Sequence, residues 1–209
     1  MDPRDLLRGA MQEQVVDYAC HRDPGFASST AEARSGGRQV AMSEQFTVTM
    51  LGGFEVYRDG QLLDLPPSCQ RLVALAALKR RAVPRSWTCR TLWPTTRPDR
   101  ATARLRTTLW RLRPMGADAL LAVTPQSIAI APDVSVDWHE SVDLIGQLVG
   151  HREPADPDRD LAAELLPLLR AGCLLDGWTD DWNAYARETY RELRLDALEV
   201  LMGSYAQDG

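Results

Sequence analysis

The sequence predicts an α+β winged helix-turn-helix, with a small antiparallel sheet, three helices and a hairpin wing, followed by an all-helical region. Two observations carry this prediction. Residues 46–132 read as strands, helix, helix, loop, arginine-rich helix and hairpin, which is the order of a winged helix-turn-helix. Residues 133–209 show helical periodicity, which is typical of antiparallel helices joined by short loops. Residues 1–45 form a separate leader.

The ordered pattern begins with three short strands. Phe46, Val48 and Met50 alternate with threonines, which is the period of a half-buried strand, and Gly52-Gly53 ends that pattern. A second alternation follows, and Asp59-Gly60 is a strong signal for a hairpin turn into the short strand QLLDL. These strands predict a small sheet ahead of the first helix.

Two helices come next. Leucines and alanines at helical spacing predict a first helix over 68–80, and Ser68 is its expected N-cap. Ser86 is the expected cap of a second, short helix, which ends before a loop with two prolines at 94–99. This second helix is expected to brace the arginine-rich helix across a groove.

The segment from Arg100 to Arg113 is the most informative part of the sequence. It holds five arginines and no acidic residue. Leu105, Leu109 and Leu112 fall at i, i+4 and i+7, one stripe of a helix that we expect to face the core. Guanidinium groups pair with phosphate or with guanine, and threonine hydroxyls contact bases or backbone. The segment therefore predicts a helix that binds nucleic acid.

A hairpin is predicted after the arginine-rich helix. Apolar residues alternate at 121–123 and again at 128–130, on either side of a turn at 125–127. In a winged helix-turn-helix such a hairpin adds a second contact along the DNA backbone.

Charge is distributed unevenly along the chain. The formal charge of the whole chain is −5. Residues 46–132 hold 13 basic and 5 acidic side chains, whereas residues 133–209 hold 6 basic and 17 acidic side chains. Phosphates respond to charge within a Debye length of about 8–10 Å, so the basic module is compatible with DNA. The acidic module is expected to lie away from a duplex, which would repel it.

The two ends of the chain carry further expectations. The leader, residues 1–45, is predicted to be mostly disordered, because it is rich in Ser, Gly and Ala, although its first part has the spacing of a short helix. Met42 is a hypothetical natural start. In the helical region Pro167 is expected to kink or split a helix. Trp178 and Trp182 are expected in the core, with the two aspartates between them capping the last helix.

Several function classes find no support in the residues. The four cysteines are far apart and form no C-x-x-C pair, so thiols are expected rather than metal ligands. The three histidines lack a catalytic arrangement, and no G-x-x-x-x-G-K loop occurs. No apolar run reaches the ~20 residues of a membrane span. We therefore expect a cytoplasmic, nucleoid-associated protein that is not an enzyme and uses no cofactor or metal.

Six stretches resemble a known family: FTVTMLGGFEVYRDG, QRLVALAALKRRAVPRSW, TLWPTTRP, ATARLRTTLWRLRPMGADALL, IAIAPDVSVDWHE and LLDGWTDDWNAYARETYRELRLDALEVL. The basic module resembles the OmpR/PhoB-type winged-helix domain. The two modules together resemble the Streptomyces antibiotic regulatory protein (SARP) family, in which that domain precedes a bacterial transcriptional activator domain. The sequence departs from the family in having no glycine in its wing turn, tryptophans at 87 and 110, and a shorter activator domain.

The resemblance implies a tetratricopeptide-like helical domain at residues 133–209. It implies an activator that binds direct repeats of double-stranded DNA as a homodimer, upstream of antibiotic biosynthetic genes. It also implies contact with RNA polymerase holoenzyme, including its sigma factor. The loop that serves this purpose in the winged-helix family corresponds to Trp93, Pro94, Thr95, Thr96 and Arg97.

The recognition helix is expected to enter the major groove, and the hairpin to touch the adjacent backbone or minor groove. Arg104 and Thr107 are the candidates for base contacts. For Trp110, burial against the hairpin, contact with a thymine methyl group and contact with polymerase all stay open. The predicted DNA-contacting residues are Arg85, Arg90, Arg100, Arg104, Arg106, Thr107, Thr108, Arg111, Arg113, Gln126 and Ser127.

The sequence thus predicts a sequence-specific DNA-binding transcription activator. The alternative is a protein-interaction or ligand-sensing module that uses the winged helix as a scaffold. A mobility-shift assay with genomic fragments separates the two, because the alternative predicts weak binding that is indifferent to sequence.

Overall fold

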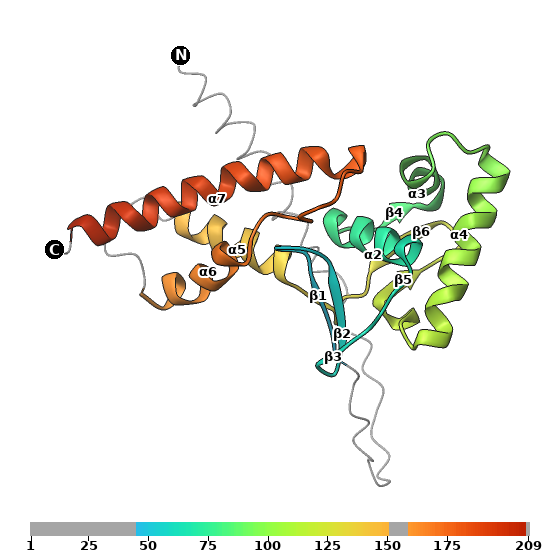
Figure 1. Cartoon of the computed structure of the whole chain (residues 1–209), viewed down its shortest axis with the longest axis horizontal. Helices are drawn as coiled ribbons and strands as arrows, with labels where there is room; N and C mark the ends of the chain where they lie inside the picture. Colours follow the sequence, from blue (N-terminus) through green and yellow to red (C-terminus); the bar gives the residue numbers. More distant parts are fainter. Residues whose placement is uncertain (1–44, 151–158, 208–209) are drawn as a thin grey trace, which may run out of the picture. The chain divides into compact units, whose positions relative to one another are not determined.

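The computed structural model describes residues 45–150 and 159–207, which belong to one compact unit (Figure 1). The predicted leader lies outside the described residues except for Gln45. Among the helices that the structure describes, none is long and apolar enough to cross a membrane.

A four-stranded sheet opens the described chain. Strand β1 (Phe46–Thr49) pairs antiparallel with β2 (Glu55–Arg58), which pairs antiparallel with β3 (Gln61–Leu62). The alternation predicted for β1 is confirmed, because Phe46 and Val48 are buried. On its other edge β1 pairs in parallel with β7 (Ser135–Val136), which the sequence did not predict because two residues carry no readable period.

The three predicted helices of the winged helix are α2 (Pro67–Lys79), α3 (Arg85–Leu92) and α4 (Pro98–Leu112). The predicted caps are wrong. Pro66 and Pro84 occupy the N-cap positions of α2 and α3, and neither Ser68 nor Ser86 does. Each N-cap therefore lies two residues before the predicted serine. Proline as the first helical residue has φ fixed near the helical value and no N–H to leave unpaired, which favours Pro67 as the start of α2.

The predicted hairpin follows two short 3-10 turns, η1 (Arg113–Met115) and η2 (Asp118–Leu120). Strands β5 (Leu121–Val123) and β6 (Ser127–Ile130) pair antiparallel, with Leu121 opposite Ile130 and Val123 opposite Ile128. A third strand, β4 (Val83–Pro84), lies along the other edge of β6. This three-stranded sheet ties the start of α3 to the wing.

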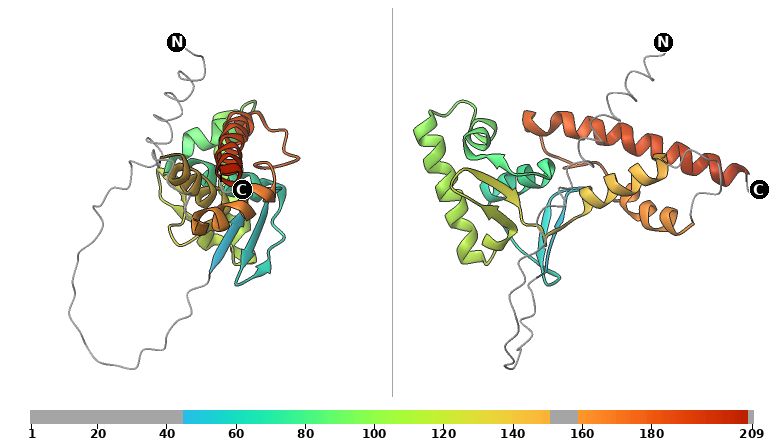
Figure 2. Two further views of the ribbon diagram at one scale, coloured as in Figure 1. Left: turned by 90° about the vertical axis from the view of Figure 1, so that its left-hand side faces the viewer. Right: turned by 180° about the vertical axis from the view of Figure 1, so that it is seen from behind.

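The helical portion consists of α5 (Asp137–Gly150), α6 (Arg159–Ala171) and α7 (Asp181–Gln207). Pro167 lies inside α6 and does not split it. Both α6 and α7 pack on α5 (Figures 1 and 2). Trp178 and Trp182 meet edge to face, with ring centroids 6.1 Å apart, and pack against the core as predicted.

The winged helix and the helical portion share one continuous core. Asp137, the first residue of α5, accepts hydrogen bonds from the backbone N–H groups of Met50 (2.8 Å) and Leu51 (3.1 Å) at the end of β1. The backbone at Gly52 also lies close to the backbone at the end of α6. A Cβ on Gly52 would lie 2.3 Å from the carbonyl oxygen of Ala171. Gly52 also has φ +80°, so a side chain is excluded there twice over.

Side chains from α2 complete this junction. Arg80 makes two hydrogen bonds of 2.7 Å to the Asp143 carboxylate on α5. Arg71 forms an ion pair with Asp180, which precedes α7. The sequence predicted that the Asp180 carboxylate caps α7, but this carboxylate pairs with Arg71.

His139 on α5 lies beside these charges. Its Nε2 atom is 2.6 Å from the carbonyl oxygen of Ala77, and a carbonyl only accepts, so Nε2 carries the proton. Burial lowers the pKa of His139 from its ordinary 6.5 to about 4. The imidazole is therefore neutral in the folded protein at pH 7.

Replacement of His139 by glutamine should flatten the acid side of the stability profile. In the wild type, the unfolded chain takes up a proton near pH 6.5 and the folded chain only near pH 4. Stability is full above the higher pKa and falls as the pH falls, by about 2 kcal/mol between pH 7 and pH 5. Thermal or urea unfolding across this range measures the difference. Equal pH dependence of the wild type and His139→Gln would contradict the assignment.

Candidate nucleic-acid interface

One face of α4 is fixed by the core. Ala101, Leu105, Thr108 and Leu112 are its buried residues, spaced at i, i+4, i+7 and i+11. Leu105 and Leu112 confirm the predicted inward stripe, and Leu109 lies at its edge, half-buried. This row packs against α2 and α3. The burial sets the rotation of α4 about its own axis, and therefore decides which residues face outward.

An uncharged ridge runs along the opposite side of α4. Ala103, Thr107 and Trp110 each follow a buried residue by two positions, which is a rotation of about 200° around the helix. All three are exposed. We call these three residues the outer ridge. They are the part of α4 that reaches farthest from the protein core.

Arginines line both flanks of the outer ridge. By helical position, Arg100, Arg104 and Arg111 lie on one side, and Arg106 and Arg113 on the other. All five are exposed, and none belongs to an ion pair that the structure describes within residues 45–150 and 159–207. Arg104 donates a hydrogen bond of 3.1 Å to the hydroxyl of Thr96. The guanidinium groups are thus available for an anionic partner.

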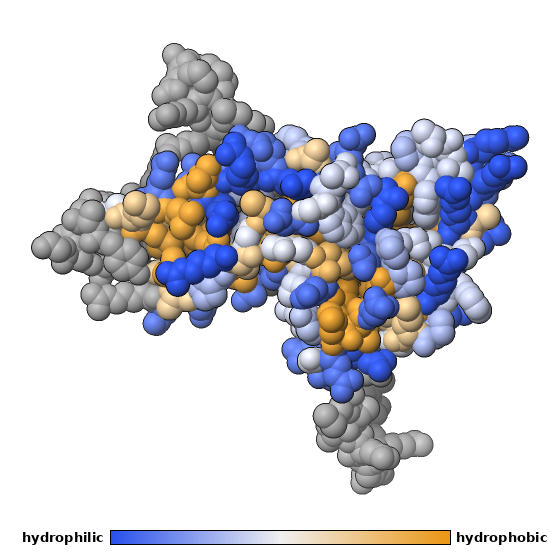
Figure 3. Space-filling model, in the orientation of Figure 1, coloured by the Kyte–Doolittle hydropathy of each residue, from blue (hydrophilic) through white to orange (hydrophobic). Residues whose placement is uncertain are grey.

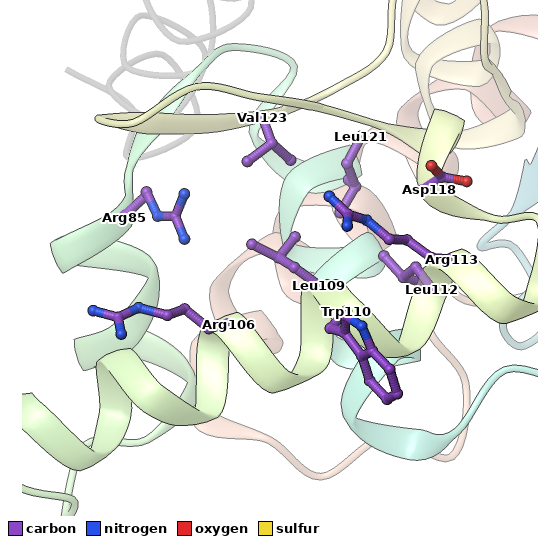
Figure 4. A pocket seen from close by; sticks show the side chains of 9 residues that line it. All are labelled: Arg85, Arg106, Leu109, Trp110, Leu112, Arg113, Asp118, Leu121 and Val123. Carbon is purple, nitrogen blue, oxygen red and sulfur yellow. The ribbon is translucent and has the colours of Figure 1, made fainter.

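A cavity of about 540 Å³ lies between α4 and the wing. Arg106 lines it from α4, Arg113 from the start of η1, and Arg85 from the start of α3 (Figure 4). Its apolar lining includes Leu109 on α4, which faces Leu121 and Val123 on the hairpin. Asp118 is the acidic residue of this lining. Three guanidinium groups around a narrow recess form a cradle suited to phosphate oxygens.

The wing turn is held by the side chain of Thr124. The Thr124 hydroxyl accepts hydrogen bonds from the backbone N–H groups of Gln126 (3.2 Å) and Ser127 (2.9 Å). Arg85 donates to the carbonyl of Thr124 (3.2 Å). Gln126 is exposed at the tip and Ser127 is half-buried. Side-chain hydrogen bonds therefore replace the backbone freedom that glycine supplies in such turns.

One residue of the predicted contact set is corrected by the structure. Thr108 is only 3% exposed and points into the core. Its hydroxyl donates to the carbonyl of Arg104 in the preceding turn (2.9 Å). A threonine can occupy a buried helical position because this local bond satisfies its polar atom. Thr107, by contrast, is exposed on the outer ridge.

The two unusual tryptophans have different settings. Trp87 on α3 is half-buried, and the Lys79 ammonium lies 5.4 Å from its ring centroid, a cation–π geometry. Trp110 is 65% exposed, so it is not covered by the hairpin. The sequence analysis left three environments open for Trp110. The position of Trp110 opposite the buried row of α4 is the signal that would have predicted its exposure.

The loop before α4 has one anchored end. Trp93 is half-buried against the core, and its carbonyl accepts a hydrogen bond from the N–H of Thr96 (3.0 Å). Pro94, Thr95 and Arg97 are exposed, whereas Thr96 is half-buried. Arg90, on the outer side of α3, is exposed as well. The structure brings these residues beside α4 but does not place them in the cradle.

The acidic helices lie away from the arginines. Helix α4 packs on α2, α3 and the 3-10 turns that follow it. Figure 1 and the right-hand view of Figure 2 show α4 and α6 at opposite ends of the described unit. The hydropathy surface is hydrophilic along the edge where α4 lies (Figure 3). The arginine face is therefore not covered by the acidic portion of the described chain.

No protein-family model matches the chain, and no curated protein matches it. Among solved structures there is a likeness. The fold is similar to that of EmbR. That structure is of Mycobacterium tuberculosis EmbR in complex with a low-affinity phosphopeptide, with a TM-score of 0.53 and 20% sequence identity. The likeness supports the fold predicted from the sequence, a winged helix followed by a helical portion.

The match covers 78% of this chain but only 43% of EmbR, so the chain spans less than half the length of that protein. At 20% identity the likeness concerns the fold alone.

Replacement of Arg106 by glutamine should weaken binding to random-sequence duplex DNA in a salt-dependent way. If the cradle binds one phosphate through Arg106, the slope of log K against log [salt] should fall by about one unit. Fluorescence anisotropy of a labelled 20-bp duplex over a salt series measures this slope. Arg170→Gln is the matched control, since Arg170 is an exposed arginine on α6. Equal slopes for the wild type and Arg106→Gln would remove Arg106 from the interface.

Proposed function

We propose that this chain is a sequence-specific DNA-binding transcription regulator of the SARP type. The single observation that carries the proposal is the outward face of α4, an uncharged ridge between two rows of arginines that form no ion pairs within the described residues. A protein surface that serves only solubility commonly mixes both signs of charge, whereas this face, beyond the exposed Asp99 in the first turn of α4, carries only positive charge. A double helix presents two rows of phosphates on either side of base edges, and the face of α4 has the matching layout.

The cradle gives the duplex a defined path. With α4 in the major groove, one phosphate backbone would run between α4 and the wing, past Arg106, Arg113 and Arg85. The tip of the wing, Gln126, would then reach the adjacent backbone or minor groove. The other flank, Arg100, Arg104 and Arg111, would meet the opposite backbone or reach guanine edges. Phosphate contacts of this kind fix register, and base-edge contacts supply specificity.

The proposal extends to activation. The resemblance to SARP regulators suggests two protomers on direct repeats upstream of antibiotic biosynthetic genes. The exposed part of the loop, Pro94, Thr95 and Arg97, would contact RNA polymerase holoenzyme with its sigma factor. In this role the protein acts without catalysis, cofactor or metal, and works at the nucleoid in the cytoplasm.

One observation favours a second candidate function, a protein-interaction module. Leu195 and Met202 are exposed on α7, and an apolar patch appears over this part of the surface (Figure 3). Such a patch suits a protein partner. It leaves the arginines of α4 unexplained, however, so we place DNA binding first.

Selection from a random-sequence duplex pool should enrich one sequence motif for the full chain. At physiological salt the enriched site should bind at least about a thousandfold more tightly than random duplex, the lower end of the range for specific regulators. Anisotropy measures both affinities, and footprinting on the enriched site counts protomers and repeat spacing. Weak, salt-sensitive binding with no enrichment would favour the interaction module instead.

A further inference from the structure

Trp110 is an exposed large apolar side chain in the middle of a cationic surface. Its 65% exposure exceeds that of Val123, the neighbouring exposed apolar residue on the wing, at 43%. Trp110 borders the cavity that Leu121 and Val123 line from the hairpin, and Figure 4 shows most of its indole extending outward from α4. Leu109 faces the hairpin across the same cavity. The fold therefore does not use the outer part of the indole, and a binding partner is the remaining source of apolar contact.

The charges around Trp110 restrict the chemistry of that partner. Arg106 and Arg113 flank it on one side and Arg111 on the other. A partner that covers the indole must therefore bring negative charge to both sides of an apolar group. A DNA major groove does this, because phosphates border both edges and the 5-methyl group of thymine is the apolar group within.

The dimensions of the outer ridge agree with a reading of adjacent base pairs. From Ala103 to Trp110 the helix rises about 10 Å. Base pairs repeat at about 3.4 Å along the duplex, so the ridge spans about three steps. Thr107 lies one turn before Trp110 and carries a hydroxyl, whereas Trp110 carries the large apolar surface. The C-terminal end of the ridge is therefore its apolar reader.

From this geometry we propose that Trp110 is a specificity-determining residue that reads thymine through its 5-methyl group. The proposal rests on the proposed function and names one base contact within it. A contact with the thymine methyl group can be distinguished experimentally from a contact with a phosphate. Removal of one methyl group from the DNA should matter, although charge, base pairing and sequence stay the same.

The test replaces single thymines by deoxyuridine in the duplex that the full chain selects from a random pool. Deoxyuridine lacks only the 5-methyl group, so each replacement isolates one apolar contact. For the wild type, at least one position should lose about fourfold in affinity, which is the effect of one buried methyl group. For Trp110→Ala the same replacement should have no effect. The double-mutant cycle between Trp110 and that methyl group measures their coupling.

Two variants control the experiment. Trp110→Leu keeps an apolar side chain and should retain part of the discrimination between thymine and deoxyuridine. Leu62→Ala removes another exposed apolar residue, on β3, and should leave the discrimination unchanged. Because the Trp110 side chain is exposed, Trp110→Ala should keep the thermal midpoint and the salt slope of the wild type. A change in either would show a structural role and overturn the proposal.

The outcomes separate this inference from the proposed function. If no motif is enriched and random duplex binds as well as any sequence, the proposed function fails. If a motif is enriched but every thymine can be replaced without loss, or the loss persists in Trp110→Ala, only the reading of thymine by Trp110 fails. If Trp110→Ala binds DNA as the wild type does but no longer binds RNA polymerase, the indole serves a protein contact and the proposal is likewise overturned.

Discussion

The burial of α2 on every side is the constraint on which the rest of the structure depends. Seven consecutive residues, 72–78, are buried, so the helix has no solvent face along two turns. Helices α3 and α4 and strand β6 pack around it. A short apolar helix of this kind is stable only within a shell of other elements, because isolated helices of its length are marginal in water. The shell includes α4, whose inward row is thereby fixed.

The same helix links the winged helix to the helical portion. The half-buried Arg71 near its start and Arg80 directly after its end pair with carboxylates next to α7 and on α5, and the carbonyl of Ala77 accepts from His139. The winged helix and the helical portion are therefore both held by contacts with α2. A shift of α5 relative to α2 would expose the neutral imidazole of His139 and leave the Ala77 carbonyl unpaired, at a cost of about 1–3 kcal/mol for the carbonyl alone.

Elements that depend on local periodicity could be predicted from the sequence, and those that depend on distant partners could not. Strand β1, the hairpin and the inward leucines of α4 all follow from spacings of two or about 3.6 residues. Strand β7 and the Asp137 contacts depend on pairing with a segment 86 residues or more away, for which no local pattern exists. The helix starts were misjudged because serine was preferred over proline as the boundary signal.

The candidate site shows the same division at the level of single residues. Exposed arginines could be predicted, because five cations in one segment cannot all be buried without partners. Thr108 was misjudged because it lies in the buried row of α4, where the bond from its hydroxyl to the Arg104 carbonyl satisfies its polar atom. The outer ridge could be identified only once the rotation of α4 about its axis was known. The buried row defines this rotation: Ala101, Leu105, Thr108 and Leu112.

The uneven distribution of charge between the two portions makes the orientation of α4 important. A basic winged helix joined to an acidic helical portion has a strong charge separation, and in the field of a duplex such a molecule turns its basic end toward the phosphates. Long-range attraction would thus bring α4 forward before any base is touched. On the proposed function, contact then brings the outer ridge between the arginine rows against the base edges. On the proposed function the arginine rows supply most of the affinity and the outer ridge adds contacts to base edges, and the buried row of α4 determines where both face.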